Sequence, residues 1–138
     1  MKREILFRGK RSDNGEWVYG YLIGNDAIVG EIVEFDEDYF ITEFWYKVNP
    51  ETVGQFTGLT DKNGTKIFDC DIISVNGKVN KLVKYIDEYA CFCLANTYEL
   101  NLKFMSPWQQ VASGWWNEFG REIEVIGTVF DNPELLKP

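Results

Sequence analysis

The sequence contains no histidine, which excludes Ser–His–Asp and Cys–His catalysis, histidine-ligated zinc and a histidine pH switch. The glycine patterns of phosphate loops and of dinucleotide-binding turns are also absent. No hydroxyl side chain has a recognisable base as a partner. We therefore predict that the protein is not an enzyme and that it binds no cofactor.

Long apolar runs are missing as well. No segment reaches the ~20 apolar residues that a membrane span needs. The first nine residues are basic but contain no apolar core, so we expect no signal peptide. Cysteine is scarce, and Cys70, Cys91 and Cys93 make an odd count. Without an export signal, we expect reduced thiols and a cytoplasmic location.

The three cysteines raise the question of a metal site. Cys91 and Cys93 fall on one face of a predicted strand, because side chains alternate along a strand. Together with Cys70 they could ligate a soft metal, but a closed zinc site needs four nitrogen or sulfur ligands. We interpret the cysteines as small core residues and predict no metal site.

Positive charge is in the minority, since 14 Lys and Arg residues against 22 Asp and Glu residues give a net charge of −8. This balance disfavours nucleic-acid binding, because phosphate contacts require cations. The cationic cluster from Lys2 to Arg11 is typical of a solvated edge strand. The alternative is a nucleic-acid-binding small barrel that combines this cluster with Lys78, Lys81 and Lys84.

Aromatic side chains are abundant, with five Trp, seven Tyr and ten Phe. Aromatic residues favour strands and bury large areas. The Asn-Gly pairs at 14–15 and 76–77 are typical of hairpin turns. These patterns predict two antiparallel meanders in an all-β protein. Gly20 lies in the middle of a predicted strand, which indicates a bulge or a close backbone approach.

The spacing of apolar residues along the sequence changes after Pro107. Ser106 and Pro107 are suited to a helix start, and apolar residues then recur with helical spacing, which predicts one short helix over 107–119. Trp115 and Trp116 would lie about 100° apart on this helix, so at least one is expected to be partly exposed. The candidate interaction surface consists of Trp108, Trp115, Trp116 and Phe119.

Carboxylates offer two further candidate sites. Asp36, Glu37 and Asp38 suit Mg²⁺, but such a run is typical of a solvated loop tip. Asp69 and Asp71 could form a carboxylate pair for acid–base chemistry. The simpler interpretation is a polar turn that leads into a strand, because no pocket is predicted around them.

Several segments, which follow one another along nearly the whole chain, resemble the YopX family of phage and prophage proteins. The matching segments are residues 3–10, 15–20, 50–64 and 124–135, including the run Thr57-Gly58-Leu59-Thr60-Asp61-Lys62-Asn63-Gly64. At one position the chain departs from the family, since Cys70 replaces a glycine. A positive φ there would strain a cysteine. Residues 96–120 match no family pattern.

The resemblance implies a fold and a source, with no catalytic residues to carry over. We expect an all-β chain with an antiparallel N-terminal meander over 1–48, a connector over 49–64 and an SH3-like small barrel over 65–138. The short helix near 107–119 is inserted in the barrel. We predict a phage or prophage accessory protein in the host cytoplasm. It would bind a host or phage protein, or itself, through aromatic side chains.

An acidic surface that mimics DNA is a further alternative. The scatter of the acidic residues along the chain gives it little support.

Overall fold

The computed structural model describes residues 4–102, 105–112 and 114–136. The chain forms two compact units, residues 1–58 and 59–138. The predicted all-β class is confirmed, because the helical structure in the described ranges consists of short 3₁₀ turns. Over the same ranges, no helix has the length and apolar character needed to cross a membrane.

Unit 1 is built around an antiparallel sheet with the strand order β6-β3-β2-β1-β7, and the order continues to β8 after the turn that follows β7. Its hydrophobic core contains Val18, Ile28 and Val48, which are buried. The elements are β1 (Phe7–Lys10), β2 (Trp17–Ile23), β3 (Ala27–Val29), β4 (Ile32–Phe35), β5 (Phe40–Thr42), β6 (Trp45–Lys47), the 3₁₀ turn η1 (Pro50–Thr52) and β7 (Gly54–Thr60).

The basic N-terminal segment lies inside this sheet. Strand β1 pairs with β2 on one side and with β7 on the other. Arg8 is buried, and its guanidinium lies 4.5 Å from the centre of the Trp17 ring. The interpretation of this segment as a solvated edge strand is therefore wrong, because the tertiary fold covers both of its edges. Residues 1–3 lie outside the described ranges.

Gly20 confirms the predicted close approach of two backbones. A Cβ atom at this position would collide with the carbonyl oxygen of Val29 on β3. The missing side chain lets β2 and β3 come together over the buried side chain of Ile28. The glycine is thus required by packing, since its φ is not positive.

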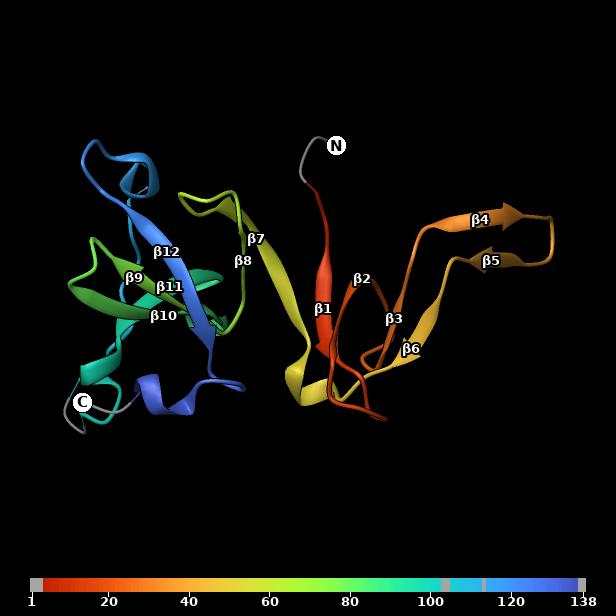
Figure 1. The fold of residues 1–138 in the computed structure, drawn as a ribbon, viewed down its shortest axis with the longest axis horizontal. Helices are drawn as coiled ribbons and strands as arrows, with labels where there is room; N and C mark the ends of the chain where they lie inside the picture. The colour runs from red at the N-terminus through yellow and green to blue at the C-terminus, as the bar shows by residue number, and fades with distance from the viewer. Residues whose placement is uncertain (1–3, 103–104, 113, 137–138) are drawn as a thin grey trace. The chain divides into compact units, whose positions relative to one another are not determined.

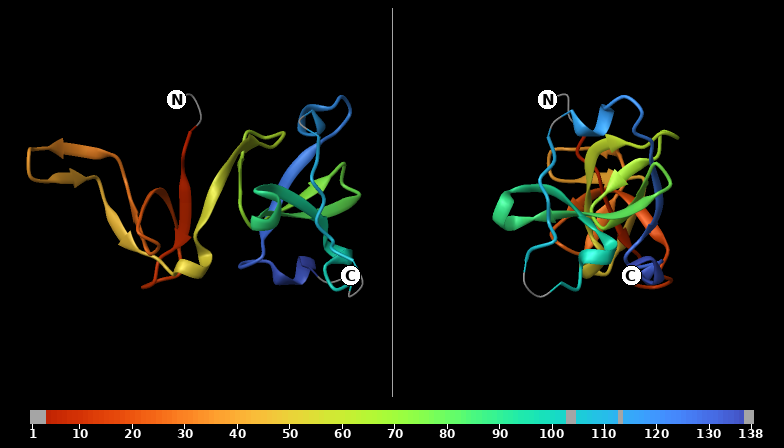
Figure 2. Two further views of the ribbon diagram at one scale, coloured as in Figure 1. Left: turned by 180° about the vertical axis from the view of Figure 1, so that it is seen from behind. Right: turned by 90° about the vertical axis from the view of Figure 1, so that its left-hand side faces the viewer.

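Strands β4 and β5 form a separate two-stranded hairpin that extends beyond the ends of β3 and β6 (Figures 1 and 2). Backbone hydrogen bonds join Gly30 to Phe44 and Glu43 to Glu31 at its base. A register shift between Ile32 and Glu34 places a bulge in β4. Residues 31–41 are all exposed, so the hairpin packs against no core in the described chain.

Unit 2 holds a curled antiparallel half-barrel with the strand order β11-β10-β9-β12. Its core cluster consists of Ile67, Ile73, Val83, Leu94 and Ile123. The elements are β8 (Lys66–Phe68), β9 (Asp71–Val75), β10 (Val79–Ile86), η2 (Asp87–Tyr89), β11 (Cys91–Asn96), η3 (Thr97–Glu99), η4 (Trp115–Asn117), β12 (Ile123–Thr128) and η5 (Pro133–Leu136).

The predicted helix over 107–119 is not present as a continuous helix in the described part of this segment. Gln109 instead forms a β-bridge with Leu94, with hydrogen bonds in both directions between their backbones. Helical structure begins only at η4, which is a single 3₁₀ turn. The edge of β11 competes for the backbone groups that a helix would use. Val111 packs on the core from this extended path, and Trp115 packs on it from η4.

Candidate functional site

The predicted aromatic surface is split by the fold. Trp115 and Trp116 are half-buried against the core cluster of unit 2, and their rings meet edge to face with centroids 5.1 Å apart. Trp108 is half-buried, whereas the side chain of Phe119 is fully exposed, at 103% of its reference area. The two adjacent tryptophans are both partly exposed, and packing against the core is their main contact.

A larger apolar surface lies on the β4–β5 hairpin. Phe35 is 76% exposed, and its cross-strand partner Phe40 is about half exposed. The other exposed apolar side chains of the hairpin are Ile32, Val33, Tyr39 and Ile41. Since Phe40 and Ile41 are adjacent in β5 and both are exposed, apolar side chains point to both faces of the hairpin. We call this element, residues 31–43, the acidic arm.

The name follows from its charge. The arm carries six carboxylates and no Lys or Arg, and the carboxylates belong to Glu31, Glu34, Asp36, Glu37, Asp38 and Glu43. Among the described residues, none of the six forms an ion pair. Glu31 accepts a hydrogen bond from the hydroxyl of Tyr21 at 2.7 Å, and this bond raises the pKa of Tyr21.

The acidic run Asp36, Glu37 and Asp38 predicts a loop tip, but it does not predict the exposed arm that carries this tip. A signal was available, because the flanking strands lack the alternation of apolar and polar residues that one buried face requires. Such a strand is either buried on both faces or exposed on both faces. Only the tertiary structure distinguishes these two cases.

Unit 2 contains a cleft of about 330 Å³ with the opposite charge. Its cationic side chains are Lys78, Lys81 and Arg121, and its aromatic side chains are Tyr98 and Trp115. The remaining lining residues are Val75, Asn76, Val79 and Asn96, so no carboxylate lines the described part of the cleft.

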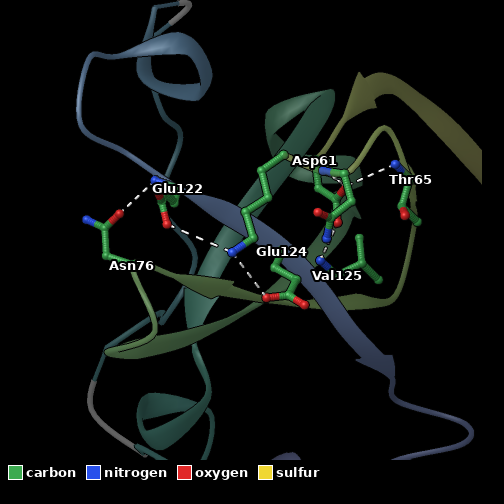
Figure 3. Close-up of polar contacts among 8 residues, drawn as sticks. Asp61, Thr65, Asn76, Glu122, Glu124 and Val125 are labelled. Carbon is green, nitrogen blue, oxygen red and sulfur yellow. Dashed lines mark hydrogen bonds and ion pairs between the residues drawn. The ribbon is translucent and has the colours of Figure 1, made fainter.

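The turn between β9 and β10 forms one wall of this cleft. Asn76 and Gly77 both have positive φ, as expected for an Asn-Gly hairpin turn. The side chain of Asn76 accepts a hydrogen bond from the backbone N–H of Glu122 at 2.6 Å, and the N–H of Asn76 donates to the carbonyl of Glu122 (Figure 3). The hairpin tip is therefore fixed to the residue that follows Arg121.

Asp61 holds the middle of β12 in place. Its carboxylate accepts backbone hydrogen bonds from Asn63, Thr65 and Val125 at 2.8–2.9 Å (Figure 3). Burial raises the pKa of Asp61, but these donors outweigh burial and hold the pKa below its usual value. The neighbouring Lys62 forms exposed ion pairs with Glu122 and Glu124, which contribute little. These contacts position β12, and they engage both carboxylate oxygens of Asp61 in hydrogen bonds.

Asp69 and Asp71 serve the turn that precedes β9. Asp71 is buried and accepts a hydrogen bond from the N–H of Phe68 at 2.7 Å. Asp69 accepts one from the N–H of Tyr85 at 3.0 Å. Between them, Cys70 has a φ of 71°. The polar-turn interpretation fits these contacts, because each carboxylate is engaged by a backbone donor.

The sulfur atoms of Cys91 and Cys93 lie 3.8 Å apart on β11. Cys93 is completely buried, and burial together with the contact to Cys91 raises its pKa to about 11. It is therefore a thiol at neutral pH. Cys70 lies elsewhere, beside the ammonium group of Lys84 at 3.9 Å. No cluster of three or more Cys, Asp or Glu side chains suited to a metal occurs in the described ranges.

Comparison with known proteins identifies the fold and the family. The structure resembles the crystal structure of protein EF1440 from Enterococcus faecalis, with a TM-score of 0.60 and 21% sequence identity. The match covers 99% of this chain and 100% of that chain. No curated protein matches this chain. A family model described as "YopX protein" matches residues 6–137, which is nearly the whole chain, so the chain belongs to the YopX family.

Proposed function

We propose that this protein is a protein-binding module that uses its acidic arm to dock on a cationic, partly apolar surface of another protein. The observation that carries the proposal is the exposure of apolar side chains on both faces of the β4–β5 hairpin. An isolated two-stranded hairpin is at best marginally stable in water. Exposed apolar patches bordered by polar groups are typical of interaction sites.

The charge of the arm indicates the class of partner. Six carboxylates without a cation account for most of the net charge of −8. A second copy of the arm would bring like charges together across the pair, which is destabilising. A cationic surface would neutralise them and would also speed association. Binding of this kind needs no catalysis. It agrees with the role of phage or prophage accessory protein in the host cytoplasm that the YopX resemblance implies.

Defined peptides test the proposal directly. The probes are a strand-forming peptide that alternates Lys with Val, a second in which Glu replaces Lys, and a third in which Ser replaces Val. We expect the Lys/Val peptide to bind at least about tenfold more tightly than the others, because it alone offers both charge and apolar contact. Fluorescence anisotropy of the labelled peptides reports the affinity.

Matched variants locate the binding surface. Phe35→Ser and Ile41→Ser should weaken binding of the Lys/Val peptide, whereas Phe119→Ser, a change at an even more exposed residue in unit 2, should not. Glu34→Gln with Glu37→Gln should weaken binding and flatten its salt dependence, with Asp87→Asn and Glu88→Gln as the charge control. Equal effects of arm and control variants would refute the arm as the site. If the protein forms a dimer and Phe35→Ser dissociates that dimer, the partner of the arm is a second copy of this chain and not a cationic protein.

A further inference from the structure

The cleft of unit 2 combines features that the acidic arm lacks. Its lining brings Lys78 and Lys81 of the β9–β10 hairpin next to Arg121, which precedes β12. In a chain with a net charge of −8, three cationic side chains around one cleft without a lining carboxylate form a local anion site. The cleft volume of about 330 Å³ lies at the lower end of the range for small-molecule sites.

Arg121 is held in a fixed position and still has N–H groups that can donate hydrogen bonds to a ligand. Its guanidinium stacks on the ring of Trp115 at 4.4 Å from the ring centre. One terminal nitrogen, Nη1, donates to the carbonyl of Trp115 and to the carboxylate of Glu118. Within the described residues, its Nε and Nη2 groups donate to nothing. These two groups form the planar fork that binds phosphate oxygens in a bidentate manner.

The two lysines keep free donors as well. Lys81 is partly buried, and its ammonium group donates one hydrogen bond, to the side-chain oxygen of Asn96 at 2.6 Å. Burial and Arg121 lower the pKa of Lys81, and Glu99 partly opposes them. The carboxylate of Glu99 already accepts a hydrogen bond from Asn96. Lys78 makes no side-chain interaction with any described residue. An anion in the cleft would therefore supply the acceptors that these ammonium groups lack.

An aromatic ring completes the set. Tyr98 is 57% exposed and lines the same cleft. Its hydroxyl accepts a hydrogen bond from Asn96 at 3.2 Å, which orients the ring. Trp115 is occupied by Arg121 and Trp116, so Tyr98 offers the open stacking surface. Exposed aromatic rings beside cations bind nucleic-acid bases by stacking, because every base has a flat π-face.

We propose that this cleft binds a mononucleotide, with the base stacked on Tyr98 and the phosphate held by Arg121, Lys81 and Lys78. Three cations are enough to neutralise the charge of about −2 that one phosphate monoester carries at neutral pH. A long single strand would need a continuous cationic track to replace its counterions. This site is independent of the acidic arm, and the proposal goes beyond the protein-binding function.

Titration with defined ligands tests the site in the full-length protein. The probes are the four ribonucleoside 5′-monophosphates, the unphosphorylated nucleosides, ribose 5-phosphate and a ten-nucleotide single strand. Isothermal calorimetry should show that at least one monophosphate binds about tenfold more tightly than its nucleoside and than ribose 5-phosphate, because stacking and phosphate binding each contribute. Kd values above ~1 mM for all four monophosphates would overturn the proposal.

Variants in the cleft separate specific binding from general charge effects. Tyr98→Leu and Lys81→Gln should each weaken monophosphate binding about tenfold. The controls are Tyr89→Leu, which changes an exposed tyrosine, and Lys84→Gln, which changes an exposed lysine of β10. Neither residue lines the cleft, so neither variant should affect binding. Circular dichroism confirms folding of each variant. Equal losses in cleft and control variants, or tighter binding of the ten-nucleotide strand with a steep salt dependence, would refute a mononucleotide site.

Discussion

The Oδ2 atom of Asp61 accepts a hydrogen bond from the backbone N–H of Val125 at 2.8 Å, although 64 residues separate the two in sequence. Val125 lies where β12 shifts its register against β9. Val125 is paired with Ile73 of β9, but β12 is the edge strand of its sheet, and the N–H groups on the open side of an edge strand have no partner in the ladder. The carboxylate of Asp61 supplies that partner and joins the turn after β7 to the last strand.

Removing this carboxylate should destabilise unit 2. Asp61→Ala leaves the N–H groups of Asn63, Thr65 and Val125 without their acceptor. Hydrogen bonds to a charged group are worth more than neutral ones, so we expect a loss of about 2–4 kcal/mol in the free energy of unfolding. Urea unfolding followed by tryptophan fluorescence measures it. Asp61→Asn keeps an acceptor and should lose less. Equal losses in both variants would show that hydrogen bonding is not the cause.

Acid should weaken the fold through the same residue. The folded-state pKa of Asp61 lies below its ordinary value of 3.8. Its ionised carboxylate therefore contributes stability that is fully present above pH ~4 and is lost as the pH falls through the folded-state pKa. The difference in unfolding free energy between the wild type and Asp61→Asn should shrink from pH 6 to pH 3, which urea titrations at each pH would measure. A constant difference would contradict this assignment.

Cys70→Gly should stabilise the protein. With a φ of 71°, Cys70 occupies a left-handed conformation in which its Cβ is strained. Glycine removes that strain but loses more conformational entropy on folding, which leaves a net gain of up to about 1 kcal/mol. Thermal or urea unfolding under reducing conditions measures the change. Cys70→Ala keeps the strain and should give no gain, so equal stabilisation by both variants would assign the effect to the thiol.

Gly20→Ala should destabilise unit 1. The new methyl group would collide with the carbonyl of Val29, and a strand backbone in a paired sheet cannot move aside cheaply. Overpacking of this kind costs about 1–3 kcal/mol. Gly114→Ala is the control, because its Cβ would meet nothing within 4 Å. Comparable urea midpoints for the two variants would argue against the close approach of β2 and β3.

Truncating two members of the predicted aromatic surface should have unequal consequences for stability. Trp115→Ala removes a ring that packs on the core of unit 2 and against Arg121, so we expect a loss of about 2–4 kcal/mol. Phe119→Ala removes a fully exposed ring and should change stability by less than about 0.5 kcal/mol. Urea unfolding measures both. A large loss in Phe119→Ala would mean that its ring packs against protein in solution.

Local patterns in the sequence predicted the strands and turns of this protein well. The Asn-Gly pair at 76–77 forms its hairpin turn, and Gly20 marks a close approach of two backbones. The turn depends on two adjacent residues, and the close approach depends on the absence of a side chain at one position. The helix over 107–119 failed because Gln109 finds backbone partners on Leu94, which no local pattern reveals. The sequence predicted strain at Cys70 only for a positive φ, and the structure shows a φ of 71° there.

The sequence by itself determined the all-β class, the excess of acidic over basic residues and the absence of histidine chemistry, because these follow from composition and local conformational preference. Only the tertiary structure decided which apolar strands are buried and which stay exposed on the acidic arm. It also decided that Lys81, Tyr98 and Arg121 line one cleft. Burial and proximity depend on contacts between residues far apart in the chain, and alternation along a strand indicates faces without showing what covers them.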